Sequence, residues 1–163
     1  MPRVGGIKVT GMDAMMSRLD RLDGKLRRKI LKQSINKASK PMIKAARANV
    51  KQQTHQETGA IRKSIGNIVR SYRRGSEAIS VIGPRRKMGI ANPRGRITIP
   101  TLIAHLVEFG TKAHSQPRHW WFRRGGHPGA RPRPFLEPAF IDTSTHMLTV
   151  LAAELTERIY NEA

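Results

Sequence analysis

The chain has 163 residues and a formal charge of +20, from 31 Lys and Arg against 11 Asp and Glu, and it contains no cysteine. This length suits one compact domain, and the lack of cysteine excludes disulfides, thiolate metal sites and cysteine nucleophiles. Hydrophobic residues make up 38% and aromatic residues 5%. We therefore expect a thin, aliphatic core that draws part of its stability from neighbouring subunits.

The strong positive charge favours a polyanionic partner. Three interpretations stay open: direct contact with nucleic acid, docking onto acidic protein surfaces, and simple solvation of a charged surface. Solvation explains an imbalance of this size poorly. The first ten residues lack the apolar core of a signal peptide, and no apolar run approaches the roughly 20 residues of a membrane span. We expect a protein that is made in the cytoplasm and has no membrane partner.

The N-terminal part is predicted to begin with an arm over residues 1–10. Thr10 can cap a first helix over 12–22 with its hydroxyl. Gly24 is expected to break or bend the chain after this helix.

A long helix is predicted over 25–52, because apolar residues recur there at steps of three or four. Pro41 lies inside this pattern and cannot donate a backbone hydrogen bond, so a kink is expected near 37–41. The other faces are basic. Twelve Lys and Arg stand between Arg18 and Lys51, against only two Asp.

The middle of the chain is predicted to contain a β-hairpin. A short helical turn, capped by the hydroxyl of Thr58, leads through Ser64 into two β-branched segments over 65–72 and 78–83. The residues between them, 73–76, are polar and suit a hairpin turn.

A basic loop over 84–95 and a short strand over 96–99 are expected next. A helix then follows over 102–109, with Thr101 as its cap and Gly110 at its end.

The C-terminal third is predicted to combine a long basic loop over 111–134 with a helix over 138–160. The last residues of the chain are mainly acidic, whereas the long helix over 25–52 is basic. Between 137 and 162 stand five acids and one base, Arg158. These acids could pair with the basic helix within one chain or between neighbouring subunits.

The predicted fold is α+β: a small, mainly antiparallel sheet packed by a long kinked N-terminal helix and a C-terminal helix, with a long basic loop. The chain is predicted to form a single domain, 1–163, with 1–10 as its arm and 111–134 as its extended loop.

Three sequence blocks carry a family resemblance in order and spacing. They are the Ala38–Pro41 segment leading into Glu57–Ile65, then Ala104–Lys112, then Arg131–Phe140. The series resembles the neck or tail-completion protein family of lambda-like siphophages and their prophages, and is more distantly similar to the minor tail protein Z group. The resemblance covers most of the chain. It implies an α+β, non-enzymatic subunit of the head–tail junction.

Two short motifs have simple structural interpretations. Thr58 and Gly59 favour a helix start, and a phosphate cradle is the weaker alternative because the pattern lacks the Gly-rich loop and its Lys-Ser/Thr ending. His105 and Glu108 lie three residues apart on one helical face. Without a third ligand they favour a hydrogen-bonded pair over a metal site.

The loop around Trp120 combines three His, three aromatic residues and five Arg without one acid. Metal binding is disfavoured beside so many positive charges, and nuclease chemistry needs clustered carboxylates. Aromatic residues with Arg are typical of protein interfaces and of platforms that stack single-stranded bases. Interface candidates are Trp120, Trp121, Phe122, Arg123, Arg124 and Phe135. Phe135 is also expected to anchor the last helix to the core.

We expect copies of the chain to close into a ring of about six or about twelve subunits. The resemblance implies partners in the adjoining neck, head-completion and tail-terminator proteins, a place in the virion, and a ring that acts in tail completion and head-to-tail joining around the DNA path. Candidates for contact with genomic DNA or an acidic partner are Arg27, Arg28, Lys32, Lys40, Lys44 and Arg47.

Two other classes of function stay open. A DNA-binding packaging or regulatory protein would fit the charge, although no helix-turn-helix or zinc finger is visible. A metal-dependent nuclease has only the histidine loop in its favour. We expect no enzymatic activity and no cofactor, because the acids are too few and too scattered for acid–base catalysis.

Overall fold

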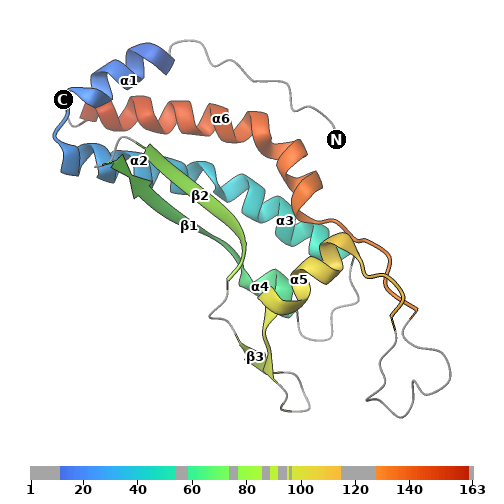
Figure 1. Cartoon of the computed structure of the whole chain (residues 1–163). Helices are drawn as coiled ribbons and strands as arrows, with labels where there is room; N and C mark the ends of the chain where they lie inside the picture. The colour runs from blue at the N-terminus through green and yellow to red at the C-terminus, as the bar shows by residue number, and fades with distance from the viewer. Residues whose placement is uncertain are drawn as a thin grey trace. The chain divides into compact units, whose positions relative to one another are not determined.

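The computed structural model describes residues 12–53, 59–73, 77–85, 89–91, 95, 97–114 and 128–161. The described elements, in chain order, are α1 (Met12–Asp20), α2 (Gly24–Ala38), α3 (Lys40–Gln53), α4 (Ala60–Ser64), β1 (Ile65–Tyr72), β2 (Glu77–Pro84), β3 (Ile90–Ala91), β4 (Ile97–Thr98), α5 (Pro100–Phe109) and α6 (Leu136–Asn161) (Figure 1). The predicted α+β class is confirmed, with its kinked long helix and C-terminal helix. The predicted arm lies outside the described residues.

The chain divides into two compact units. The first unit comprises residues 1–44, 67–82 and 141–163, and the second comprises 45–66 and 83–140. Each unit is described separately below. The single domain expected from the sequence stays a prediction.

An aliphatic core holds the first unit together. Leu19 of α1, Ile30 of α2 and Leu155 of α6 are almost fully buried in one cluster. Methionine and leucine side chains pack around it, and Ala78 of β2 contacts it from the hairpin. The cluster therefore joins segments from both ends of the sequence.

α2 follows α1 after a short break and begins with a side-chain cap from Asp23. The Asp23 carboxylate accepts a hydrogen bond from the Lys25 amide at 2.9 Å, which satisfies a free donor of the first turn. Gly24, expected to bend the chain, is the first residue of α2. The first helix ends at Asp20, two residues earlier than predicted.

The predicted kink in the long helix is confirmed at Ser39. Pro41 has no amide hydrogen and cannot donate to the carbonyl of Lys37, which would be its helical partner. The Ser39 hydroxyl donates to the Ile35 carbonyl at 2.8 Å, a bond that also bends helices. The helix therefore divides into α2 and α3, with Ser39 between them.

β1 and β2 form an antiparallel hairpin against α2 (Figure 1). Two hydrogen bonds join the hairpin to the long helix. The hydroxyls of Ser39 and Ser80 lie 2.9 Å apart, and the Asn67 side-chain amide donates to Asn36 at 2.9 Å. The face turned toward α2 is thus largely small and polar. The predicted turn begins at Arg73, which has φ 47° and pairs with Glu77 at 2.9 Å.

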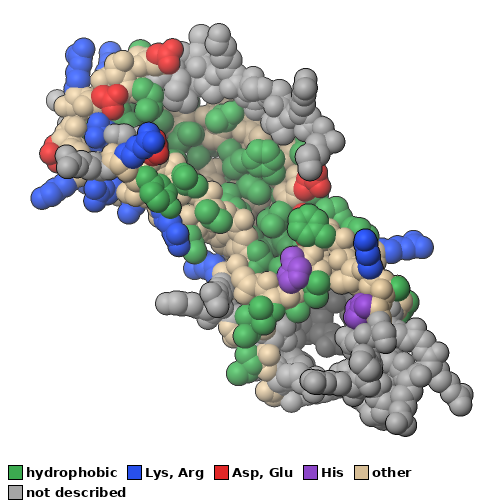
Figure 2. All heavy atoms as spheres, viewed as in Figure 1, with side chains coloured by type: hydrophobic (Ala, Val, Ile, Leu, Met, Phe, Trp, Pro, Cys, Tyr) green, Lys and Arg blue, Asp and Glu red, His purple; other side chains and the backbone are tan. Residues whose placement is uncertain are grey.

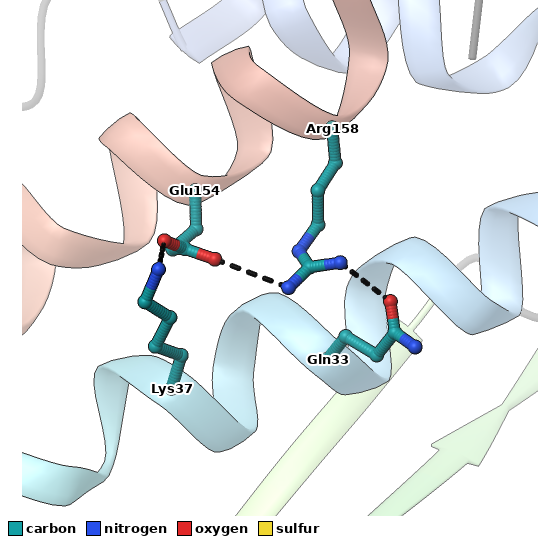
Figure 3. Close-up of polar contacts among 4 residues, drawn as sticks. All are labelled: Gln33, Lys37, Glu154 and Arg158. Atoms are coloured by element: carbon teal, nitrogen blue, oxygen red, sulfur yellow. Dashed lines mark hydrogen bonds and ion pairs between the residues drawn. The ribbon is translucent and has the colours of Figure 1, made fainter. Parts of the chain in front are cut away.

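A polar bridge ties α6 to α2 (Figure 3). The Glu154 carboxylate is 5% exposed, forms an ion pair with Lys37, and accepts from Arg158 at 3.3 Å. Arg158 also donates to Gln33 at 2.6 Å. Acid from the C-terminal helix and base from the N-terminal helix therefore pair within one chain at this position.

The second unit contains two short helices and a small sheet. β3 pairs antiparallel with β4, Ile90 opposite Thr98 and Ala91 opposite Ile97. The strand at 97–98 agrees with the sequence, whereas β3 lies where a loop was expected. Buried hydrophobic side chains in this unit come from α3, α4, β1, α5, α6 and the residue before α6: Ala46, Val50, Ala60, Ile65, Ala104, Ala139 and Phe135.

α5 begins earlier than predicted. Ile99 is its N-cap residue and makes no side-chain cap, and Pro100 follows at the first helical position. Proline fits there because the first turn leaves its amide positions unpaired and its φ is already helical. Thr101 is therefore inside the helix, where its buried hydroxyl has no hydrogen-bond partner among the described residues, and its predicted capping role is wrong.

Across the described parts of the chain, no helix is both long enough and apolar enough to cross a membrane.

Candidate interaction surfaces

α5 presents an apolar face to solvent. Leu102, Leu106 and Phe109 are spaced by four and three residues, which places them on one side of the helix. Their exposed fractions are 64%, 39% and 76%, and the adjacent Ile103 is 36% exposed. Figure 2 shows hydrophobic side chains gathered over this part of the second unit. We call these four residues the α5 face.

The buried residues of α5 lie on the opposite side. Pro100, Ala104 and Glu108 follow one another at intervals of four and are all buried. The helix therefore turns small and polar groups inward and its large apolar groups outward. Contiguous exposed apolar surface of this kind marks an interaction site.

The hairpin has a second exposed apolar face in the first unit. Ile68 and Tyr72 on β1 are 50% and 45% exposed, and Ile79 and Val81 on β2 are 52% and 61% exposed. Because side chains alternate along a strand, these residues share the face turned away from α2. The sequence pattern predicted the strands but did not show which face is buried.

Glu108 caps the start of α6. Its carboxylate accepts backbone hydrogen bonds from Phe135 at 2.9 Å, from Leu136 at 3.1 Å and from Glu137 at 3.1 Å. A carboxylate in this position satisfies free amides and complements the positive end of the helix. Among the described residues, His105 makes no hydrogen bond to Glu108, so the predicted pair is wrong.

This cap also explains where α6 begins. The helix was predicted from Pro138, but the Glu108 carboxylate satisfies the amides that precede it, so the helix starts at Leu136. Pro138 then lies in the first turn, where proline is tolerated. The cap joins segments 27 to 29 residues apart, a link that helix periodicity does not reveal.

The predicted long loop is closed at its base. Thr111 and Ala130 form an antiparallel bridge, with amide-to-carbonyl distances of 2.9 and 3.0 Å. Gly129 beside this bridge has φ 86°, and a Cβ there would lie 2.3 Å from the Thr111 carbonyl oxygen. Arg133 adds a backbone bond to Val107 at 2.8 Å. The loop therefore leaves and re-enters the second unit at one place.

The central interface candidates Trp120, Trp121, Phe122, Arg123 and Arg124 lie outside the described residues. Phe135 is 1% exposed, so its ring is enclosed by the chain itself and is not available to a neighbouring subunit. Its proposed interface role is therefore corrected, and its alternative role as a core anchor fits the burial.

The basic candidates divide into exposed and internally bonded side chains. Arg28 and Lys32 lie four residues apart on the solvent side of α2, and Lys40 and Lys44 are exposed on α3. Lys and Arg side chains gather over the first unit in Figure 2. Arg27, by contrast, donates to Asp20 at 3.1 Å and its side chain is only 16% exposed. One end of its guanidinium is therefore paired within the chain.

Arg47 belongs to the second unit. Its guanidinium donates to the Ile65 carbonyl at 2.7 Å while the residue as a whole stays exposed. The group is therefore held in place at the surface.

No constellation for metal chemistry is visible in the described segments. Within them, no three His, Asp or Glu side chains lie close enough together to hold a metal ion.

Comparison with protein families identifies the chain. A family model described as "Bacteriophage HK97-gp10, putative tail-component" matches residues 13–110. The chain belongs to this family of phage tail components, which confirms the resemblance seen in the sequence and implies a place in the virion. Comparisons with curated proteins and with solved structures find no match.

The matched residues include α5 and Glu108 but end at Gly110. The α5 face and the carboxylate that caps α6 are thus part of the region shared with the family. The closed loop and α6 itself follow the matched region.

Proposed function

We propose that the chain is a non-enzymatic subunit of a homo-oligomeric ring at the neck of a tailed phage. In this proposal the ring acts in tail completion and in joining the tail to the head, seats on adjoining neck and tail-terminator proteins, and surrounds the path of the DNA. Assembly takes place in the host cytoplasm. Membership of the tail-component family supports the structural role.

The observation that carries the ring proposal is the α5 face. The chain has a charge of +20, so copies repel one another wherever cations meet. The α5 face is built from Leu102, Ile103, Leu106 and Phe109 and has no cation of its own. A second copy can therefore approach there without juxtaposed charge, and burying the face gains hydrophobic free energy.

A substitution on the α5 face tests the proposal. We expect Leu102→Glu to shift the purified protein from a closed oligomer toward monomer, because a carboxylate would be buried in an apolar contact. Ile141→Glu on α6 is the matched control, since it makes the same change at a side chain of similar exposure, 58% against 64%. Light scattering after size exclusion and native mass measurement give the masses.

Both variants should keep the fold of the parent chain, seen as an unchanged circular dichroism spectrum, because neither side chain is buried within the subunit. A parent chain that stays monomeric at all concentrations and is missing from purified virions would refute the ring. Equal loss of assembly in both variants would show that the contact between subunits does not depend on the α5 face.

A further inference from the structure

A pocket of about 350 Å³ lies on the second unit. The described residues that line it are Arg47 on α3, Arg62 and Lys63 on α4, and Gly59 at the start of α4. Three cations from two helices therefore face one concavity, and its described lining contains no acid.

The cations of the pocket are positioned and available. Arg47 is fixed by its bond to the carbonyl of Ile65, a residue that is completely buried. Arg62 and Lys63 are exposed, and among the described residues neither forms an ion pair or side-chain hydrogen bond. The described lining brings three like charges together with no counter-charge among them, which is unfavourable unless an anion binds.

Gly59 shapes the rim of the pocket. Its backbone has φ 61° and ψ 21°, a left-handed conformation that residues with a Cβ adopt at a cost. Its carbonyl accepts from the Lys63 amide at 2.9 Å, which closes the turn of α4. The turn places Arg62 and Lys63 in succession beside Arg47.

We propose that this pocket binds a phosphate of the DNA backbone. Guanidinium groups match the oxygens of a phosphodiester through paired N–H donors, and lysine adds a point charge. Duplex DNA presents one negative charge per roughly 1.7 Å of its axis, so it can supply a phosphate to the same pocket of every subunit in a ring. Contact with the backbone alone makes the binding independent of base sequence.

The inference rests on the proposed function, because the ring around the DNA path supplies the DNA. The pocket can still be tested separately from ring formation. It assigns Arg47 to DNA contact through a specific site and adds Arg62 and Lys63, which follow the Thr58-Gly59 motif for which a phosphate cradle was the weaker alternative. It also commits to DNA over an acidic protein surface.

The test is the salt dependence of binding to a fluorescent duplex, measured by anisotropy for the full chain and two double variants. Arg62→Gln with Lys63→Gln removes two of the three positive charges that line the pocket. Arg70→Gln with Lys112→Gln removes the same charge from exposed residues elsewhere. We expect the slope of log affinity against log salt to fall by about 1 for the pocket variant, because one phosphate contact is lost per chain, and by less than about 0.5 for the control.

Equal losses in the two variants would show that only total charge matters and would overturn the site. An unchanged slope in the pocket variant, or no binding of the parent chain to any duplex, would do the same. If DNA binding persists while binding of a polyglutamate peptide is lost in the pocket variant, the pocket belongs to an acidic protein. If oligomers form and the slope does not change, the pocket fails and the ring stands. If the parent chain stays monomeric and the salt slope falls in the pocket variant, the pocket stands and the ring fails.

Discussion

Glu108 shows how one side chain can define an element that begins 28 residues later. Its carboxylate is 7% exposed and bonds to three successive amides at the start of α6. The sequence identified Glu108 as structural and not catalytic or metal-binding, but it gave the wrong partner. The error follows from helix geometry, which relates His105 and Glu108 and carries no information about Phe135.

Replacing the cap should weaken the second unit. We expect Glu108→Gln to lower the free energy of unfolding by about 2 kcal/mol, because a neutral amide has one acceptor oxygen and loses the interaction with the helix end. Chemical denaturation measures this. Glu137→Gln removes an exposed carboxylate from the same first turn, and a loss as large as that of Glu108→Gln would argue against the cap.

Glu154 gives the first unit a dependence on pH. The hydrogen bond from Lys37 lowers the pKa of the Glu154 carboxyl, burial opposes this, and the charges of Lys37 and Arg158 lower it further. The net pKa lies below its ordinary value, so the folded chain holds this proton less tightly than the unfolded chain. The resulting stabilisation is present above the ordinary pKa of glutamate and is lost as pH falls through the lowered value.

The corresponding measurement is the melting temperature across an acid titration. We expect Glu154→Gln to melt below the parent chain near neutral pH, and the difference to shrink as the solution is acidified through the glutamate range. Glu157→Gln, an exposed acid on the same helix, should follow the parent curve throughout. A constant difference between Glu154→Gln and the parent would contradict the assignment.

At the scale of elements, features that depend on local rules were predicted well. Proline chemistry located the kink within three residues of Ser39, and β-branched residues located both strands of the hairpin. β3 was missed because two residues carry almost no pattern and its pairing with β4 is not local. The two exposed apolar faces were missed because periodicity groups side chains on a face without showing whether that face is covered.

The base of the loop offers a test at this scale. We expect Gly129→Ala to destabilise the bridge by about 1–3 kcal/mol, because the new Cβ would meet the Thr111 carbonyl and φ 86° is strained for alanine. Faster hydrogen exchange at the amides of Thr111 and Ala130 would report it.

Gly83→Ala is the control, since a Cβ there meets no atom within 4 Å and its φ is not left-handed. It should leave exchange at the bridge unchanged. If Gly129→Ala also leaves that exchange unchanged, the bridge does not depend on the glycine.

At the scale of the whole molecule, composition indicated a basic chain, and the three sequence blocks indicated the tail-component family. Neither could show which cations are paired within the chain and which stay available to a partner. Arg27, Lys37 and Arg158 are held by partners within the first unit. Arg62 and Lys63 face a pocket in the second unit. A net charge counts these groups alike, whereas the folded chain separates internal bonds from surfaces that can meet an anion.

The bridge between Thr111 and Ala130 has a consequence for how this chain can vary. A backbone pair joins Thr111 to Ala130, and the cost of closing a loop grows slowly with its length. We therefore expect residues added between these two positions to leave the bridge in place. A peptide tag inserted there would locate each copy in an intact particle.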